Sequence, residues 1–358
     1  MRYGLIGCGR IAVNHIKAVV ANNLYLQAVC DIEPEHIDVL FEKTQFDKNP
    51  KRYTDYREMI DENPDLQLVA IATESGIHAE IALYCINKGI NVIIEKPMAM
   101  SMKDADAIVE AAEKNNVKVS VCHQNRFNVA VQKTRKALES GRFGQISHGS
   151  INVRWNRGKQ YYDQAPWRGK WASDGGCLFN QCIHGIDLLR WMMGVQIDSV
   201  YAVTKRQFHD YIECEDLGTA IIKFSNGAVG TVEGTVNVFP QNLEETLYIF
   251  GRTGTVKIGG KSTNNIDVWN FSDETAEDEA NKGLEEQTSN VYGNGHISLY
   301  ADVIEAIEKD RPVYINAIDG RNAVEAVLAI YESAATGKAV TLPLRNVAST
   351  DYAGRFDK

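Results

Sequence analysis

The chain has 358 residues, enough for two domains with substantial cores, and its net charge is −9. An acidic chain argues against a nucleic-acid-binding protein, which normally needs a basic surface to neutralise phosphates. No apolar run is long enough to span a membrane, no leader peptide is recognisable, and the 7 cysteines are scattered without a Cys-x-x-Cys pair. We therefore expect a cytoplasmic protein with reduced thiols, no membrane partner and no metal site.

The amino-terminal residues predict a dinucleotide-binding unit. Residues 3–6 are typical of a short buried strand, and the loop Gly7-Cys8-Gly9-Arg10-Ile11-Ala12 follows it directly. A helix over 13–21 and a second strand over 24–30 come next, and Asp31 follows that strand. This is the G-x-G-x-x-G/A fingerprint between a strand and a helix, the context in which it binds a pyrophosphate.

Each position of the fingerprint has a physical role. Gly7 permits the tight turn, Gly9 lets the backbone approach the pyrophosphate, and Ala12 is small enough for the helix to pack on the strand. Asp31 is placed to accept hydrogen bonds from the adenosine ribose hydroxyls and to repel a 2′-phosphate, which favours NAD over NADP. The residues of this region expected at the cofactor are Gly7, Gly9, Arg10, Ile11 and Asp31.

Strand and helix continue to alternate over the next hundred residues. Strands are predicted over 68–72, 90–94 and 118–122, and helices over 55–61, 79–88 and 101–115. Repeated units of this length predict a parallel, doubly wound sheet with right-handed crossovers. We assign residues 1–122 to this NAD-binding domain.

Glu95-Lys96-Pro97 follows the strand at 90–94. Open α/β sheets bind ligands at the carboxyl ends of their strands, so Lys96 is expected where it can hydrogen-bond a substrate hydroxyl. The competing interpretation is an exposed loop lysine. His78 opens the helix after the preceding strand, where it either contacts cofactor or substrate or caps the helix.

The carboxyl-terminal part, residues 123–358, changes its period and predicts a substrate-binding domain. Strands are expected over 146–152, 199–205, 217–224, 229–237 and 247–251, several with period-two alternation, and Ser225-Asn226-Gly227 is a hairpin signal. Helices are expected at about 176–193, 296–309 and 319–336. The polar stretch 262–292 is expected to be a loop outside the core. A sheet with one free face predicts a homo-oligomer, a dimer or a tetramer.

A second chemical cluster lies in the helix predicted over 176–193. Asn180, His184 and Asp187 are spaced i, i+4, i+7, which places them on one helical face. Histidine titrates near neutral pH, so His184 suits a general base for the proton of an alcohol that loses a hydride. Asp187 either orients His184 or is a structural hydrogen-bond partner. A purely structural histidine is the alternative.

The segment 154–169 is rich in arginines and aromatic residues although the chain is acidic. Arginines clamp carboxylates or phosphates, and aromatic rings stack on sugars or donate hydroxyls, so the segment suits an anionic, sugar-like ligand. The competing interpretation is a loop that packs on the sheet through its aromatic rings.

Together these motifs resemble the Gfo/Idh/MocA oxidoreductase family, a Rossmann domain followed by an α/β domain with a large, mostly antiparallel sheet. The resemblance rests on residues 7–12, Asp31, 73–78, 95–97, 124–127, 167–168 and 175–187. It implies that Lys96 and His184 are the catalytic pair. It also implies that Thr73, His78, Glu95, Lys96, Gln124, Trp167 and Arg168 lie at the cofactor.

Finer detail is similar to one subgroup, the UDP-N-acetylglucosaminuronate 3-dehydrogenases of bacterial surface-polysaccharide synthesis. The similarity lies in residues 73–76, 161–169 and 180–184, and it implies substrate contacts from Lys96, Arg157, Tyr161, Asn180, Gln181 and His184. Inositol-dehydrogenase-like members have an aspartate where this chain has Asn180, so an aspartate–histidine relay is not expected. 2-Oxoglutarate, which recycles NAD in some members of the subgroup, is a candidate partner. The alternatives are a dehydrogenase of inositol or another free polyol, and a non-catalytic NAD-binding sensor.

Overall fold

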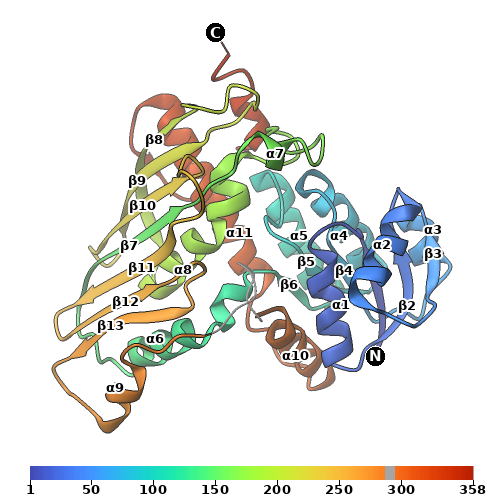
Figure 1. The fold of residues 1–358 in the computed structure, drawn as a ribbon, viewed down its shortest axis with the longest axis horizontal. Coiled ribbons are helices and arrows are strands. Elements are labelled where there is room, and N and C mark those ends of the chain that lie inside the picture. Colours follow the sequence, from blue (N-terminus) through green and yellow to red (C-terminus); the bar gives the residue numbers. More distant parts are fainter. Residues whose placement is uncertain (287–294, 358) are drawn as a thin grey trace. The chain divides into compact units, whose positions relative to one another are not determined.

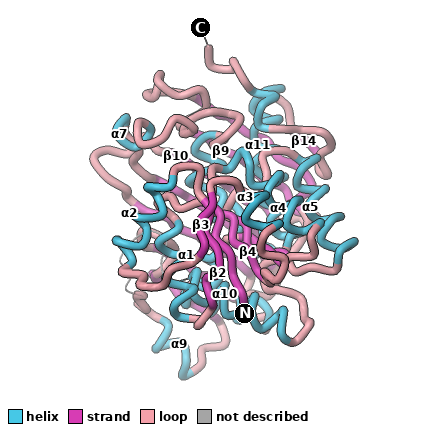
Figure 2. The backbone as a smooth tube through the Cα atoms, turned by 90° about the vertical axis from the view of Figure 1, so that its right-hand side faces the viewer, coloured by secondary structure: helices cyan, strands magenta, loops and turns pink. Residues whose placement is uncertain are grey.

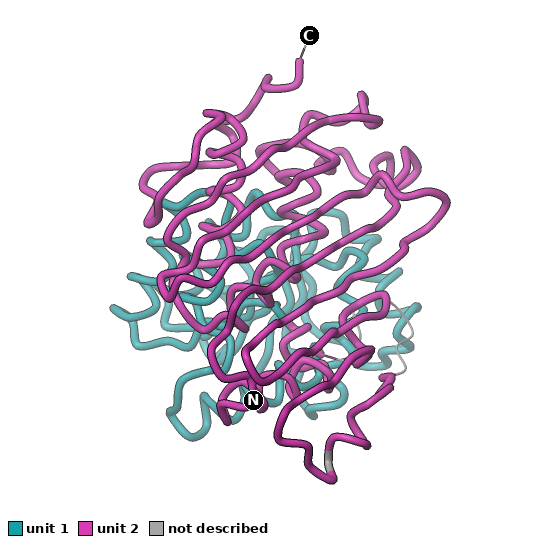
Figure 3. Tube along the Cα trace, turned by 90° about the vertical axis from the view of Figure 1, so that its left-hand side faces the viewer, with its two compact units in different colours: residues 1–123, 296–321 teal, residues 124–295, 322–358 magenta. Residues whose placement is uncertain are grey.

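The computed structural model describes residues 1–286 and 295–357, and these form two compact units (Figure 1). The first unit comprises residues 1–123 and 296–321, and the second comprises residues 124–295 and 322–358 (Figure 3). No helix of the described residues is both long and apolar enough to cross a membrane.

The first unit is built on a six-stranded sheet in the order β3-β2-β1-β4-β5-β6, with every pair parallel. This confirms the predicted doubly wound sheet. Its strands are β1 Arg2–Ile6, β2 Tyr25–Cys30, β3 Lys51–Tyr53, β4 Leu68–Ile71, β5 Asn91–Ile94 and β6 Val119–Val121. Its helices from the amino-terminal part are α1 Ala12–Ala21, α2 Pro34–Thr44, α3 Tyr56–Asp61, α4 His78–Asn87 and α5 Met102–Asn115, with a short helix η1 at Ser75–Ile77.

The sheet is buried because helices cover both of its faces. Figure 2 shows α1 and α2 on one side and α4 and α5 on the other. All four residues of the central strand β4 are buried, as expected of a parallel strand covered on both faces. The strand order reverses between β1 and β4, and such a reversal point is where doubly wound sheets bind ligands.

A distant segment completes the first unit. Residues 296–321, which include most of helix α10 (Gly295–Glu308), pack with residues 1–123, whereas the sequence had placed them in the second domain. The contacts are specific: the hydroxyls of Tyr3 and Tyr300 lie 2.7 Å apart, and the Ser120 hydroxyl donates to the Ile315 carbonyl. Packing of this kind joins residues almost 300 positions apart, so it leaves no local sequence signal.

The second unit contains an eight-stranded sheet in the order β13-β12-β11-β7-β10-β9-β8-β14. Only the β7–β10 pair is parallel, which confirms the expected large, mostly antiparallel sheet. The strands are β7 Ile146–Arg154, β8 Ile197–Lys205, β9 Leu217–Phe224, β10 Val229–Thr235, β11 Glu244–Gly251, β12 Gly254–Gly259, β13 Asn265–Phe271 and β14 Val340–Thr341. The helices are α6 Val129–Glu139, α7 Lys159–Tyr162, α8 Ile183–Met193, α9 Ala276–Asn281 and α11 Ala317–Thr336, with short turns η2 Gln124–Phe127, η3 Leu178–Cys182 and η4 Ser349–Tyr352.

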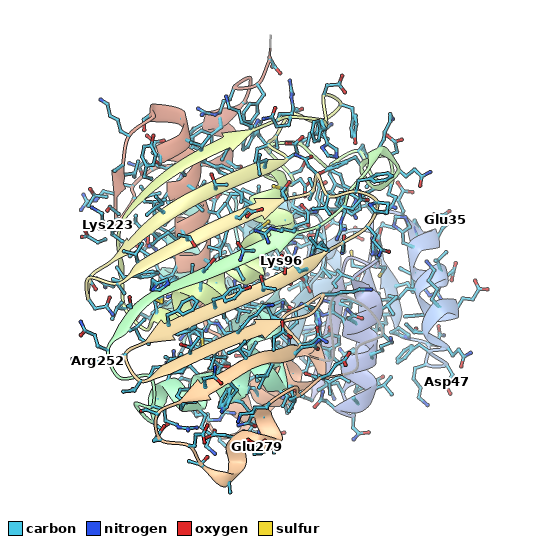
Figure 4. The ribbon with its side chains drawn as sticks, turned by 60° about the vertical axis from the view of Figure 1, so that its left-hand side comes forward. Glu35, Asp47, Lys96, Lys223, Arg252 and Glu279 are labelled. Atoms are coloured by element: carbon cyan, nitrogen blue, oxygen red, sulfur yellow. The ribbon has the colours of Figure 1, made fainter. Side chains whose placement is uncertain are left out.

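One face of this sheet is covered by α8 and α11 (Figure 1). Alternation in the strands follows from this: in β9, Gly218, Ala220 and Ile222 are buried and the residues between them are exposed. Among the described residues of the second unit, no helix lies in front of the opposite face (Figure 3), and the side chains of this face project outward (Figure 4).

One sequence expectation in this unit is wrong, and another is confirmed with a local irregularity. The stretch 262–292 was expected to lie outside the core, yet β13 (Asn265–Phe271) forms an edge strand and buries Ile266, Trp269 and Phe271. Residues 287–294 of that stretch lie outside the described residues. The helix expected over 176–193 is confirmed, but its residues Leu178–Cys182 form a π-helical turn before α8 begins at Ile183. The π turn changes the helical phase, so the i, i+4, i+7 argument does not hold across it.

Candidate active site

The glycine loop after β1 is shaped to receive a pyrophosphate. Gly7 has a φ of +93°, and a Cβ there would lie 2.5 Å from the Ala72 carbonyl group, so the turn requires glycine. A Cβ on Gly9 would meet no atom within 4 Å, so the chain leaves open space beside it. No side chain caps the amino terminus of α1. An uncapped helix end beside an open glycine fits the phosphates of NAD.

Asp31 lies at the end of β2 and is held in place. Its Oδ2 accepts a hydrogen bond from the Cys8 amide at 2.7 Å, and its Oδ1 accepts one from the Glu33 amide at 2.9 Å. His36 lies 3.1 Å from the same Oδ1. These bonds fix the carboxylate next to the glycine loop, the position that the ribose of NAD requires.

The loops after β4 and β5 are tied together by His78. Its Nδ1 lies 2.8 Å from the Pro97 carbonyl oxygen and its Nε2 lies 3.1 Å from the Thr73 carbonyl oxygen. Burial lowers the pKa of His78, and because both partners are carbonyl oxygens the ring donates at least one of these two bonds. His78 is the first residue of α4, but its side chain bridges the two loops and does not cap the helix, and its contact with cofactor or substrate stays a prediction.

The Glu-Lys-Pro motif lies at the carboxyl end of β5, as predicted. Lys96 is half-buried and its peptide bond to Pro97 is cis. Glu95 is buried, and its Oε1 lies within hydrogen-bonding distance of His15 and His296. No local pattern in the sequence indicates either histidine, because both reach Glu95 through the fold. Contact between Glu95 and the cofactor stays a prediction.

In the second unit, Tyr161 joins several of the predicted ligand residues. Its hydroxyl is hydrogen-bonded by Arg168 and by the Gln181 side chain, the latter at 3.1 Å. The Arg168 guanidinium lies over the rings of Tyr161 and Trp167, 4.2 and 4.4 Å from their centroids, and the Arg157 guanidinium lies 5.2 Å from the Tyr161 centroid. The fold therefore gathers the arginines and aromatic rings that the sequence singled out.

Arg168 has an unsatisfied donor in this cluster. Its Nε is buried and has no hydrogen-bond partner among the described residues. A buried guanidinium N–H without an acceptor is costly, and an anionic or polar ligand would relieve it. Arg154, by contrast, is bound to Glu233 and Glu244 on the sheet and is not available as a ligand clamp.

His184 is the second residue of α8 and is 7% exposed. Asn180, in the π turn, donates to Asp174, and Gln181 reaches Tyr161. Asp187 accepts two hydrogen bonds from Arg126, at 2.7 and 2.6 Å, and both side chains are fully buried. Asp187 is thus a structural partner of Arg126, and an orienting contact with His184 stays a prediction.

Sequence reasoning missed the support beneath this helix. Glu215 is fully buried, and its Oε1 accepts a hydrogen bond from the Leu178 amide at the start of the π turn. The Tyr331 hydroxyl lies 2.8 Å from the same oxygen. A Cβ on Gly176 would lie 2.0 Å from Glu215 Oε2, which explains one glycine of the pair that precedes the helix. The glycine pair was the available sequence signal, but it did not identify its partner.

The predicted site residues thus form two groups. In the first unit, Gly7 and Gly9 belong to one loop, and Asp31 is hydrogen-bonded to it. In the same loop Arg10 is exposed and Ile11 is half-buried. His78 links Thr73 to Pro97. In the second unit, Arg157, Tyr161, Trp167, Arg168 and Gln181 form one cluster, Asn180 pairs with Asp174, and Gln124 is buried in η2. The predicted catalytic pair is divided, with Lys96 in the first unit and His184 in the second.

Comparison with known proteins agrees with this architecture. Residues 1–123 match the family model described as an oxidoreductase family with an NAD-binding Rossmann fold. Residues 131–257 match the model for the GFO/IDH/MocA C-terminal domain.

Among solved structures, the chain is similar to the WlbA dehydrogenase of Bordetella pertussis, whose crystal structure contains NADH and UDP-GlcNAcA. The identity is 35% and the TM-score 0.87, over 96% of this chain and 98% of the other. The corresponding enzyme of Chromobacterium violaceum is 36% identical with a TM-score of 0.87, over 96% of each chain. Myo-inositol 2-dehydrogenase of Thermotoga maritima is 26% identical over 72% of this chain and 74% of its own length.

Proposed function

Because the chain belongs to the Gfo/Idh/MocA family of NAD-dependent sugar and polyol dehydrogenases, we propose that it oxidises the C3 hydroxyl of UDP-N-acetylglucosaminuronate to the 3-keto sugar. The substrate choice rests on Arg168, whose guanidinium lies over the rings of Tyr161 and Trp167 and whose buried Nε has no hydrogen-bond partner within the described part of the chain. A UDP-sugar uronate offers a carboxylate and a diphosphate to such a group. The similarity to two enzymes crystallised with UDP-GlcNAcA supports the same choice.

The chemistry needs one hydride acceptor and one proton acceptor. NAD⁺, held by the Gly7–Ala12 loop and Asp31, supplies the hydride acceptor. His184 takes the proton of the C3 hydroxyl, since a neutral imidazole is a suitable base near pH 7. Lys96 donates a hydrogen bond to the same oxygen and stabilises its developing negative charge.

A free polyol is the second candidate substrate. Relatives at 22–26% identity include several inositol dehydrogenases. Asn180 counts against this choice, because inositol-dehydrogenase-like enzymes have an aspartate at this position. In this chain the Asn180 side chain donates a hydrogen bond to Asp174. A non-catalytic NAD-binding sensor is the third hypothesis, and the presence of both Lys96 and His184 counts against it.

We also propose that the chain self-associates through the open face of the large sheet. Tyr201, Ile221 and Val229 stand on this face with 47, 51 and 38% of their surface exposed, and strand register places Tyr201 opposite Ile221. Exposed apolar side chains on a broad sheet face are typical of a subunit interface. Light scattering should show a dimer or tetramer, and Ile221→Lys should shift it toward the monomer.

Three further parts of the proposal concern context. The enzyme is proposed to act in the cytoplasm, where its free, buried cysteines stay reduced, and in the synthesis of a bacterial surface polysaccharide such as lipopolysaccharide. 2-Oxoglutarate is proposed as an oxidant that regenerates NAD⁺ from tightly bound NADH. This last point is tested by adding 2-oxoglutarate to the protein with NADH bound and following the loss of the NADH absorbance.

The substrate proposal is tested by Arg168→Gln. Loss of a charged hydrogen bond of about 1.5–3 kcal/mol should raise KM for the UDP-sugar about 10- to 100-fold. Lys159→Met is the matched control, since Lys159 lies in the same segment but is exposed and paired with Asp163. Equal KM values for Arg168→Gln and Lys159→Met would contradict the assignment of Arg168.

The catalytic pair is tested separately. Lys96→Met and His184→Ala should each remove most turnover while the protein still binds NAD⁺. Normal turnover by the His184→Ala variant would contradict the assignment of His184 as the general base. Absence of any NAD⁺ reduction by the unaltered protein, with all substrates tested, would favour the sensor.

A further inference from the structure

A buried polar cluster surrounds Glu95, one residue before the proposed catalytic lysine. His15 Nε2, from α1, lies 3.2 Å from Glu95 Oε1, and His296 Nε2, from α10, lies 3.0 Å from the same oxygen. Glu95 is 5% exposed, His15 is fully buried and His296 is 3% exposed. All three belong to the first unit, although His296 is separated from Glu95 by 201 positions.

The cluster continues into a chain of hydroxyls. His15 Nδ1 lies 2.5 Å from the Tyr300 hydroxyl, which lies 2.7 Å from the Tyr3 hydroxyl. One set of proton positions satisfies the chain: both Nε2–H groups donate to Glu95, Tyr300 donates to His15, and Tyr3 donates to Tyr300. Neutral histidines and an ionised glutamate fit this arrangement.

The directions of the pKa values agree with it. Burial by itself would raise the pKa of Glu95, but the hydrogen bonds from His15 and His296 hold it well below its usual value. Burial lowers the pKa of His15. The fold therefore keeps a negative charge inside the first unit, where a lone carboxylate would cost several kcal/mol.

The carboxylate also reaches the lysine's own backbone. Glu95 Oε2 accepts a hydrogen bond from the Lys96 amide at 3.2 Å. The carboxylate thus links two buried histidines to the main chain from which the Lys96 side chain departs. A displacement of about 1 Å at a catalytic group can cost about 100-fold in rate, so such a link has a functional consequence.

We propose that Glu95 is a positioning residue for Lys96 and that His296, supplied by the distant helix α10, completes its support. This inference rests on the proposed catalytic role of Lys96. It gives residues 296–321 a role in the chemistry that their place in the sequence does not suggest.

A metal site is the competing assignment for the same atoms. Ligand atoms of His15, Glu95, Cys122 and His296 all lie within 4.8 Å of one another. The hydrogen bonds already satisfy Glu95 and the two Nε2 atoms without an ion, and burial raises the pKa of the Cys122 thiol well above its usual value. A metal-bound cysteine would be a thiolate. Stoichiometric zinc or another divalent metal in the purified protein would overturn the proposal.

The test is a double-mutant cycle between His296 and Lys96. His296→Leu should lower kcat on the order of 10- to 100-fold, with little change in KM for the UDP-sugar. His296→Gln retains an N–H donor near the position of Nε2 and should recover most of kcat. In a Lys96→Met background, His296→Leu should cost no more than about threefold, because the group that it positions is gone. Equal losses in both backgrounds would overturn the proposal.

Ile108→Ala separates positioning from general destabilisation. Ile108 is fully buried in α5, away from the cluster, so its truncation should lower the melting temperature and leave a cycle with Lys96→Met additive. If His296→Leu does not fold, Glu95→Gln replaces it in the same cycle, with the same expected result.

A measurement that needs no substrate tests the positioning of Lys96 separately from the proposed function. The rate of Lys96 acylation, relative to that of exposed Lys88 in the same sample, is followed by peptide mass spectrometry. It should rise in Glu95→Gln and His296→Leu and stay unchanged in Ile108→Ala. An unchanged ratio in the first two variants would overturn the positioning role, even if no UDP-sugar is turned over.

Discussion

Glu215 gives the second unit a predicted dependence of stability on pH. Burial raises the pKa of this carboxyl from its usual 4.5 to about 8. The Tyr331 hydroxyl has one proton and two possible acceptors, the Gly175 carbonyl and Glu215 Oε1. When Glu215 is protonated, its carboxyl can donate to the Tyr331 hydroxyl, whose own proton then goes to the Gly175 carbonyl.

The sign of the effect follows from proton linkage. Between about pH 4.5 and about pH 8, the unfolded chain has lost the Glu215 proton and the folded chain keeps it. The free energy of unfolding therefore falls as pH rises through this window and levels off above about pH 8. At 1.36 kcal/mol per pH unit, the part of this loss between pH 5.5 and pH 8.5 is about 3 kcal/mol.

Glu215→Gln isolates this contribution. The amide retains an acceptor for the Leu178 N–H and does not titrate, so the variant should lose about 3 kcal/mol less than the unaltered protein between these pH values. Urea unfolding followed by tryptophan fluorescence measures it, because all 5 tryptophans lie in the second unit. Glu332→Gln, on the same helix α11, is the control. Parallel pH profiles for Glu215→Gln and the unaltered protein would refute the reasoning.

Three further predictions concern single positions. Gly176→Ala places a Cβ 2.0 Å from Glu215 Oε2 and should destabilise the protein by more than about 2 kcal/mol, whereas Gly194→Ala, with positive φ but open space, should cost about 1 kcal/mol; similar melting temperatures would contradict the steric argument. Asp31→Ser should raise KM for NAD⁺ about 10-fold or more and improve the relative use of NADP⁺, as steady-state kinetics with both cofactors will show. Arg126→Met removes both hydrogen bonds that Asp187 accepts from Arg126 and leaves it Arg190, 3.6 Å away, so it should cost about 3 kcal/mol in urea unfolding, and the loss should be largely recovered in the double variant with Asp187→Leu.

The first unit was the part of the fold most accessible from the sequence. Each of its predicted strands and helices is found within one or two residues of its expected ends, because buried parallel strands are short apolar runs bounded by turn residues. The glycine fingerprint and Asp31 are also local signals. Their observed geometry, with an open Gly9 and a fixed Asp31, follows from the strand–turn–helix that carries them.

The parts that sequence reasoning missed depend on distant contacts. β13 is the exception, because it pairs with the adjacent β12, and its apolar residues Ile266, Trp269 and Phe271 lie within a stretch that is polar as a whole. The π turn before His184 and its support by Glu215 depend on residues more than thirty positions apart. The histidines that hold Glu95 come from α1 and α10, so no periodicity or spacing could have indicated them.

The central claim is that this dehydrogenase acts on a nucleotide-sugar uronate, and one comparison tests it most directly. Reduction of NAD⁺ by the purified protein is followed by absorbance with UDP-N-acetylglucosaminuronate, myo-inositol and levoglucosan as substrates. The account predicts that kcat/KM for the UDP-sugar exceeds that for either of the others by a factor on the order of 10⁴, since a site built for the uronate and diphosphate leaves its polar groups unpaired with a free polyol. A kcat/KM for myo-inositol or levoglucosan equal to or above that for the UDP-sugar would contradict it.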